Sequence, residues 1–218
     1  MEQEEALYKV LKETIIASKN IRFEGDGYSE EWKAEALKRG LTNISHVPEA
    51  IMRFNDPQSR SVLIGENIFN ENELTCRMEV ELEKYTKKVQ IESRILGDLA
   101  INHIIPTAVI YQNRLLENLR GLRETFSPEE YEELGAERKD LVKEIQFRIL
   151  DIKRLVRDMI QARHVANRMA SQVEKAYSYQ ESVSPYMEKI REHIDELELE
   201  IDDEIWPLPK YRELLFTK

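Results

Sequence analysis

The chain has 218 residues, enough to bury a core as one large domain or two small ones. Hydrophobic residues make up 41% and charged residues 34%, with only 7 Gly and 7 Pro, which argues against both disorder and a many-stranded sheet rich in tight turns. The net charge of −10 repels phosphate backbones and anionic lipid, so we expect neither a nucleic-acid nor a membrane partner. An all-α fold is the prediction.

The N-terminus and the cysteine content favour a cytoplasmic location. The first five residues, MEQEE, are acidic, unlike the basic start of a signal peptide. No apolar run approaches the ~20 residues needed to cross a bilayer. The single cysteine, Cys76, excludes an intrachain disulfide and a cysteine-rich metal site. We interpret it as a cytosolic thiol that packs as a small apolar side chain on a helix.

The N-terminal third of the chain predicts short helices separated by loops. Residues 2–19 have one apolar helical face, and a turn follows at Gly25-Asp26-Gly27. Ser29 is the expected N-cap of the next helix, and Gly40 its left-handed end. Pro48 should begin a third short helix.

From Asn70 onward the pattern is typical of long helices. Asn70 and Glu73 have the spacing of a capping box, so a helix should begin at Glu71. Apolar residues then recur at a 3-4 spacing. Pro106 should kink this helix, because it removes an amide donor and clashes with the carbonyl four residues earlier. A continuous helix to Phe126 would span ~80 Å at about 1.5 Å per residue.

Capping and heptad signals predict two further long helices. Ser127-Pro128-Glu129-Glu130 indicates a new N-terminus. Beyond a possible break at Gly135, a heptad pattern runs for about five repeats, interrupted only by Arg163. Its stripes are Val142, Ile149, Val156, Ala170 and Tyr177, and Ile145, Ile152, Met159, Ala166 and Val173. Ser184 should begin the last long helix, and the two prolines of Trp206-Pro207-Leu208-Pro209 should end it.

Opposite charge predicts which helices pack together. Residues 138–168 hold nine basic and four acidic residues, a net of +5, whereas residues 184–206 hold nine acidic and two basic ones, a net of −7. We expect these helices to be antiparallel neighbours. Exposed ion pairs contribute only ~0–1 kcal/mol each, so the apolar stripes should supply most of the stability. The predicted fold is an elongated antiparallel bundle of long helices, preceded by short helices and loops.

No spacing in the sequence indicates a catalytic site. Gly25-Asp26-Gly27 lacks the third glycine of a dinucleotide-binding loop, and no phosphate-binding loop motif occurs. The histidines lie far apart, and none has the spacing of a zinc-binding pair. They are His46, His103, His164 and His193. We therefore predict no catalytic, cofactor-binding or metal-ligating residue in this chain.

Three features have both a structural and a functional interpretation. His103, beside the predicted kink, is expected to bond a freed carbonyl rather than to act in catalysis. Arg163 either pairs with a carboxylate of the acidic helix or extends to solvent. Asp202-Asp203-Glu204, with Glu198 and Glu200, has the oxygen ligands of a Mg²⁺ site. The preferred interpretation of this cluster is a solvated acidic helix end that the basic helix neutralises.

Five segments carry a family resemblance. They are RFEGDGYSEEW at 22–32, QIESR at 90–94, NHIIPT at 102–107, YQN at 111–113 and DDEIWPLPKYRELLF at 202–216. Together they resemble type III glutamine synthetases. The first looks like a segment late in the catalytic domain, the next three resemble that family's long helix, and the last is similar to its C-terminus.

The resemblance implies an enzyme that joins glutamate and ammonia, uses ATP and Mg²⁺ or Mn²⁺, and assembles into large homo-oligomeric rings. The family's metal- and nucleotide-binding residues lie upstream of these motifs, so it implies a C-terminal piece that is inactive alone. Residues 1–84 would finish the catalytic domain, and residues 85–218 would form a helical C-terminal extension. That extension would brace the catalytic domain and contact neighbouring subunits.

Two other classes of function stay open at this point. A free-standing helical interaction or adaptor protein would have the same stripes and charge pattern. A small metal-dependent enzyme would need the acidic cluster at Asp202–Glu204 to hold its cation.

Overall fold

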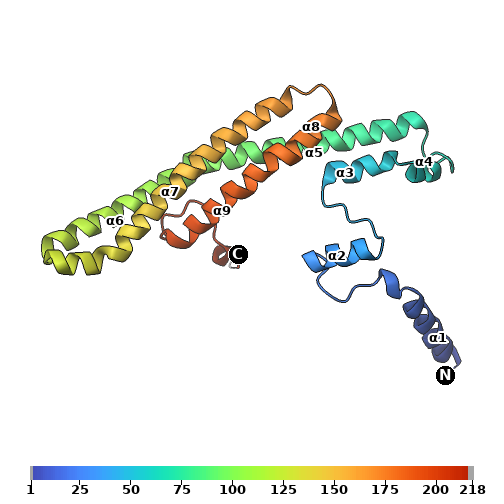
Figure 1. The fold of residues 1–218 in the computed structure, drawn as a ribbon, viewed down its shortest axis with the longest axis horizontal. Coiled ribbons are helices and arrows are strands. Elements are labelled where there is room, and N and C mark those ends of the chain that lie inside the picture. The colour runs from blue at the N-terminus through green and yellow to red at the C-terminus, as the bar shows by residue number, and fades with distance from the viewer. Residues whose placement is uncertain (1, 216–218) are drawn as a thin grey trace. The chain divides into compact units, whose positions relative to one another are not determined.

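The computed structural model describes residues 2–215, and every regular element among them is helical. The all-α prediction is confirmed. The chain divides into two compact units, Met1–Ala50 and Ile51–Lys218. The second unit contains the long helices, which run alongside one another as a bundle (Figure 1).

The first unit consists of short elements. Helix α1 (Glu2–Ala17) leads into a 3₁₀ turn, η1 (Lys19–Ile21), and α2 (Glu30–Lys38) follows after a loop. The Ser29 hydroxyl accepts the Trp32 amide at 3.2 Å, which confirms the predicted N-cap. Gly40 has a φ of +71°, the left-handed conformation predicted for the residue that ends this helix.

Arg39 connects α2 to the preceding loop. Its Nη1 donates to the backbone carbonyls of Asn20 at 3.1 Å and Arg22 at 2.5 Å, and its Nε donates to Glu35 at 2.6 Å. These charge-assisted hydrogen bonds hold the end of α2 against the end of η1. The first unit is thus held by local polar contacts more than by a core.

Short helices also lie around the boundary between the units, which falls within helix α3 (Val47–Met52). Helix α3 is followed by η2 (Arg53–Asn55) and α4 (Pro57–Leu63). The first long helix, α5 (Glu71–Leu99), then begins with a complete capping box. Asn70 accepts the Glu73 amide at 2.9 Å and Glu73 accepts the Asn70 amide at 2.8 Å, as predicted.

Two prolines are accommodated by π-helical turns. Helix α5 continues through η3 (Ala100–Ile104), a π-helix, into α6 (Ile105–Thr125), which has Pro106 as its second residue. A second π-helix, η4 (Tyr179–Val183), lies just before Pro185. A proline has no amide and clashes with the carbonyl four residues earlier, and a wider i→i−5 turn moves that carbonyl away. The interruption predicted at Pro106 is therefore a π-helical turn just before the proline.

The break predicted at Gly135 is wrong. Helix α7 (Pro128–Asn167) runs 40 residues without interruption from a Ser127–Glu130 capping box. Gly135 is buried, and a Cβ at this position would lie 3.3 Å from Leu119 Cδ2 on α6. The glycine therefore allows α6 and α7 to approach closely.

The residues of the heptad pattern are divided between two helices and do not form one continuous helix. Helix α7 ends at Asn167, and α8 (Gln172–Ser178) begins after Ser171, whose hydroxyl accepts the Glu174 amide at 3.5 Å. Helix α9 (Ser184–Glu200) begins at Ser184, as predicted, and the π-helix η4 leads into it without a loop. Apolar residues after the turn keep the heptad spacing because α8 also packs against the bundle.

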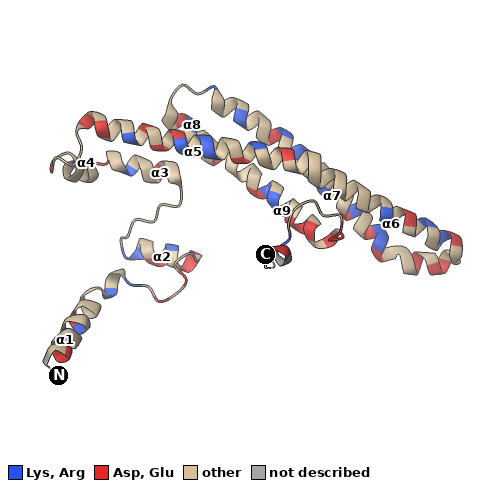
Figure 2. Ribbon diagram, turned by 180° about the vertical axis from the view of Figure 1, so that it is seen from behind, with Lys and Arg blue, Asp and Glu red and all other residues tan. Residues whose placement is uncertain are grey.

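The core of the second unit lies where α7 packs against α6 and α9, and where α5 packs against α8. Helices α7 and α9 run antiparallel, as their charges predicted (Figure 1). Basic residues are spread along α7 and acidic ones gather toward the end of α9 (Figure 2). Arg148 and Glu196 join the two helices at 3.5 Å. The buried stripe residues include Ile145, Ile149, Ile152, Met159, Ile190, Ile194 and Leu197.

Candidate functional site

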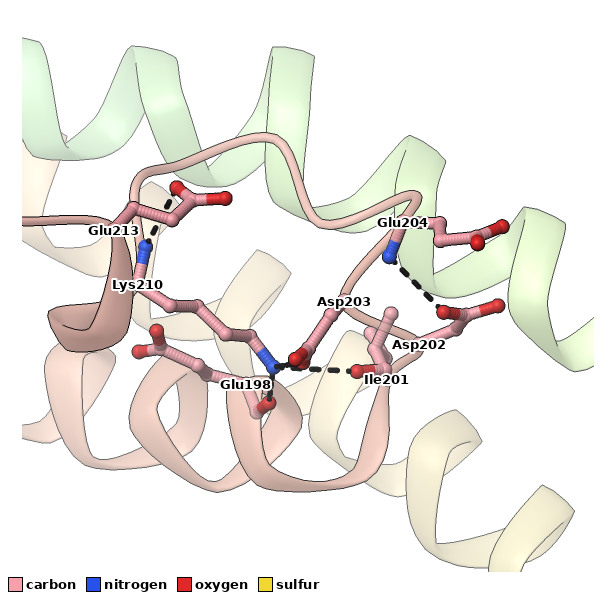
Figure 3. Close-up of polar contacts among 7 residues, drawn as sticks. All are labelled: Glu198, Ile201, Asp202, Asp203, Glu204, Lys210 and Glu213. Atoms are coloured by element: carbon pink, nitrogen blue, oxygen red, sulfur yellow. Dashed lines mark hydrogen bonds and ion pairs between the residues drawn. The ribbon is translucent and has the colours of Figure 1, made fainter. Parts of the chain in front are cut away.

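The acidic end of α9 is organised around one lysine, Lys210 (Figure 3). Its Nζ donates to the backbone carbonyl of Glu198 at 2.7 Å and to that of Ile201 at 3.4 Å. The same Nζ lies 2.5 Å from the Asp203 carboxylate. A cation at this position satisfies carbonyls that the helix end leaves free and interacts favourably with the helix dipole.

This arrangement corrects the predicted end of the last helix. Helix α9 ends at Glu200, well before Pro207, because Ile201 is extended with φ −84° and ψ 139°. The chain then turns back so that Trp206 is buried in the core and Lys210 reaches the helix end. The C-terminal end of α9 is thus set by tertiary contacts, and Pro207 and Pro209 lie beyond it in the sequence.

Two carboxylates of the acidic cluster pair with basic residues that the sequence interpretation did not assign to it. Asp202 pairs with Arg114 of α6 at 3.1 Å and accepts the Glu204 amide at 3.0 Å, while Asp203 pairs with Lys210. Neutralisation by the basic helix α7 is therefore wrong. Among the described residues no group of three His, Cys, Asp or Glu side chains could hold a metal ion. Asp202 and Asp203 each have a basic partner, Arg114 and Lys210 respectively, which a metal ion would have to displace.

The histidines and the cysteine form no site. His46, His103 and His164 are exposed, and His193 is half-buried with an Nδ1 that has no hydrogen-bond partner. In the described part of the chain, the His103 ring makes no hydrogen bond to a freed carbonyl, so its predicted structural role is absent. Cys76 is exposed on α5, which corrects its interpretation as a packed apolar side chain.

Arg163 does not pair with a carboxylate of the acidic helix, and its side chain is only partly removed from solvent. It is half-buried on α7, near Arg94 of α5 and Tyr179 of η4, and its Nε is buried without a hydrogen-bond partner. Burial and the nearby Arg94 charge lower the pKa of Arg163 from its ordinary value. Burial also raises the pKa of Tyr179. Among the described residues no carboxylate lies within ion-pair distance of Arg163, so it does not pair with the acidic helix.

An apolar pocket of about 450 Å³ lies beside the N-terminal half of α5. Its lining residues are Ile51, Phe54, Phe69, Leu74, Arg77, Met78 and Glu81. The Arg77 guanidinium lies 4.5 Å from the centre of the Phe69 ring, a cation–π contact. The pocket walls bring together no nucleophile with a base, and thus no constellation for covalent catalysis.

The second unit is thus a helical bundle in which Asp202 and Asp203 pair with basic side chains. Residues 6–123 match the model of the glutamine synthetase C-terminal domain, and the chain belongs to that family. The resemblance inferred from the five sequence segments is confirmed. The match extends to both sides of residue 84, and the division into residues 1–84 and 85–218 stays a prediction.

Three relatives are similar along almost the whole chain. The chain is 70% identical over 216 residues to a glutamine synthetase of Bacteroides fragilis and 30% identical over 223 residues to a type-3 glutamine synthetase of Dictyostelium discoideum. It is 28% identical over 217 residues to a glutamine synthetase of Butyrivibrio fibrisolvens. These alignments cover 98–99% of this chain but only 29–30% of the relatives. Across the described residues, no helix has the length and apolar character required to span a membrane.

Proposed function

We propose that this chain acts as the C-terminal part of a glutamine synthetase, bracing the catalytic domain and supporting contacts between subunits without supplying catalytic residues. The whole enzyme would make glutamine from glutamate and ammonia with ATP and Mg²⁺ or Mn²⁺, as a cytoplasmic homo-oligomer. The observation that carries the proposal is the 70% identity to the Bacteroides fragilis protein across 99% of this chain and 30% of that relative.

Exposed apolar side chains on α1 support the bracing role. All are at least 50% exposed, and they are Leu7, Tyr8, Val10, Leu11 and Ile15. A contiguous apolar surface of this kind is typical of an interface with another protein surface. In the proposed enzyme, the rest of the catalytic domain would cover it.

The bundle has the properties of a rigid brace. Helices α5 and α7 start at complete capping boxes, and its core is continuous along α7 and α9. Outside that core, Phe147 and Leu150 of α7 are more than half exposed, which supports a contact with a neighbouring subunit. A stiff element with apolar surface is suited to linking subunits rather than to chemistry.

The first experiment tests whether the chain has activity of its own. The purified 218-residue chain is incubated with glutamate, ammonia, ATP and Mg²⁺ or Mn²⁺, and glutamine is measured. We expect no synthesis above a control without protein. Glutamine formation above that control would contradict the non-catalytic role.

The second experiment tests the bracing role in a full-length glutamine synthetase that contains this segment. Leu11→Asp places a charge on the apolar face of α1, whereas Lys9→Asp places the same charge on the opposite face, because residues two apart are separated by about 200°. We expect Leu11→Asp to lower the thermal inactivation temperature or dissociate the oligomer, and Lys9→Asp to do neither. Equal behaviour of the two variants in light scattering and inactivation would contradict the proposal.

A further inference from the structure

The apolar pocket beside the N-terminal half of α5 has one side that is fixed by helix packing. Its most buried lining side chains are Leu74 of α5, 1% exposed, and Ile51 of α3, 9% exposed. Ile51 also packs in a small core cluster with Leu82 of α5 and Ala176 of α8. Because three helices meet in that cluster, this side of the pocket is formed without a ligand. The volume of about 450 Å³ is in the range of pockets that bind small molecules.

Phe69, an aromatic wall of the pocket, is held in place by contacts on both sides of it in the sequence. The Phe69 amide donates to the carbonyl of Leu63 at 2.9 Å, and the next residue, Asn70, caps α5. Arg60 of α4 pairs with Glu71 in the first turn of α5. These contacts tie the connection between α4 and α5 to both helices, so the Phe69 wall is also present without a ligand.

Arg77 is the positively charged residue of the pocket lining. Its guanidinium carbon lies 4.5 Å from the centre of the Phe69 ring, and the residue is exposed. In the part of the chain that the structure describes, Arg77 has no carboxylate at ion-pair distance and no hydrogen-bond acceptor. A cation–π contact uses no hydrogen-bond acceptor, so the guanidinium group keeps its N–H donors for a ligand.

Glu81 is the acidic residue of the lining and lies one turn beyond Arg77 on α5. Its carboxylate pairs with Lys84 at 2.6 Å, so its charge is offset by a residue that does not line the pocket. The other five lining side chains are apolar. A ligand in the pocket therefore meets apolar walls and one positive charge that has no acidic partner.

This combination favours a ligand that is both apolar and anionic. An apolar ring displaces water from the walls, and a guanidinium group holds both oxygens of a carboxylate with two parallel hydrogen bonds. A strongly polar ligand, such as a sugar or a nucleotide, would leave polar groups without partners against the five apolar side chains. A cationic ligand would be repelled by Arg77.

We propose that this pocket binds a small monocarboxylate with an aromatic or branched apolar body. The apolar body contacts Phe54, Phe69 and Met78, and the carboxylate pairs with Arg77. The ligand is a free small molecule, because a pocket of this volume within one chain suits a single compact molecule. This binding function is additional to the bracing role and does not depend on it.

The test uses the 218-residue chain and three probes that share one ring system and differ in charge. At neutral pH naphthylacetate is an anion, naphthylethanol is neutral and naphthylethylamine is a cation. Binding is followed by isothermal titration and by the NMR signal of the Met78 methyl group, which is identified by its loss in Met78→Leu.

Two variants change the pocket and a third is the matched control. Arg77→Gln removes the charge, and Phe54→Ala removes a wall that is 48% exposed, so the fold should tolerate its loss. Arg94→Gln is the control, since Arg94 is an exposed arginine of the same helix that does not line the pocket.

We expect naphthylacetate to bind with a Kd of about 1 mM or lower and to shift the Met78 methyl signal in a saturable manner. Naphthylethanol should bind more weakly, and naphthylethylamine more weakly still. Arg77→Gln should weaken naphthylacetate binding about 10-fold and naphthylethanol binding less than about 2-fold. Phe54→Ala should weaken both about 5-fold, and Arg94→Gln should change neither.

The charge series on the unmodified chain tests the proposal whether or not Arg77→Gln folds. Binding of naphthylethanol or naphthylethylamine as tightly as naphthylacetate would overturn the carboxylate assignment. Absence of a saturable shift of the Met78 methyl signal would overturn the pocket as a ligand site. Sedimentation velocity adds a further check, because self-association that Phe54→Ala abolishes would show that a second copy of the chain fills the pocket instead.

Discussion

The two units of this chain use the same helical pattern with different outcomes. In Met1–Ala50, α1 has an apolar face whose side chains are at least half exposed, and Ala36 is the buried apolar side chain of α2. In Ile51–Lys218, the stripes of α7 and α9 face each other and are buried along their length. An amphipathic helix gains stability only when another surface covers its apolar face. The first unit thus depends on a surface outside itself, whereas the bundle provides its own.

The largest expected effect tests this difference directly. Ile152 of α7 is fully buried, and Leu11 of α1 is 50% exposed. Ile152→Ala should lower the free energy of unfolding by about 2–5 kcal/mol, because it removes buried methylene groups and leaves a cavity. Leu11→Ala should change it by less than about 0.5 kcal/mol, since the side chain is already largely in water. Chemical denaturation of the isolated chain measures both, and similar losses would show that α1 contributes to the same core.

The helix boundaries that sequence predicted correctly depend on local interactions. Asn70, Ser127 and Ser29 each accept an amide three residues ahead, so the residues that form each cap lie within one turn of sequence. The apolar stripes were predictable for the same reason, because helical periodicity is local. Even the pairing of α7 with α9 followed from their opposite charges.

The incorrect predictions involve residues that meet only after folding. Gly135 was taken as a break, but its missing side chain accommodates Leu119 of another helix. Periodicity alone could not show the turn after Asn167, because α8 returns to the same core with the same spacing. The end of α9 depends on Lys210, whose partners lie up to twelve residues away.

The acidic cluster at the end of α9 was only half predictable. Asp202, Asp203 and Glu204 were recognisable in the sequence as a run of carboxylates. Their basic partners were not, because Arg114 lies on a different helix and Lys210 pairs with Asp203 only where the chain turns back after α9. No spacing rule connects Asp202 with Arg114, so only the folded structure could identify that pair.

Removing the charge of Lys210, which contacts the end of α9, should have the next largest effect on the free energy of unfolding. Lys210→Met should lower the free energy of unfolding of the bundle by about 1–3 kcal/mol, because Asp203 and the carbonyl of Glu198 lose a charged donor. Hydrogen exchange of the last turn of α9 should rise in parallel. Lys189→Met is the matched control, since Lys189 is exposed on the same helix. Unchanged exchange in Lys210→Met would contradict the capping role.

Two equivalent N-caps offer a smaller test of how the units differ. Ser127 caps α7 in the bundle and Ser29 caps α2 in the first unit. Ser127→Ala should lower the free energy of cooperative unfolding by about 1 kcal/mol. Ser29→Ala should leave that transition unchanged and raise hydrogen exchange only within α2, because the first unit does not share the core of the bundle. A shift of the main transition by Ser29→Ala would show that the two units unfold together.

The smallest expected effect is a pH dependence from the Glu130 carboxylate of the same capping box. The Ser127 amide donates to Glu130 at 3.0 Å, and this backbone hydrogen bond holds the pKa of Glu130 below its ordinary value of 4.5. The folded-state pKa is lowered, so the stabilisation is fully present above pH 4.5 and is lost as the pH falls through the folded value.

Glu130→Gln should therefore make unfolding of the bundle less dependent on pH below 4.5, the ordinary pKa of this group. Glu129→Gln, one residue earlier in the same first turn, is the matched control and should leave the pH profile in place.

In the first unit, the hydrogen bond from Arg39 lowers the pKa of Glu35 in the same direction. If the two units unfold separately, Glu35→Gln should leave the acid limb of the bundle transition unchanged. Denaturation midpoints measured between pH 3 and pH 6, roughly centred on the carboxylate range, compare the three variants. A change of that limb by Glu35→Gln as large as that by Glu130→Gln would show that the first unit is stabilised together with the bundle.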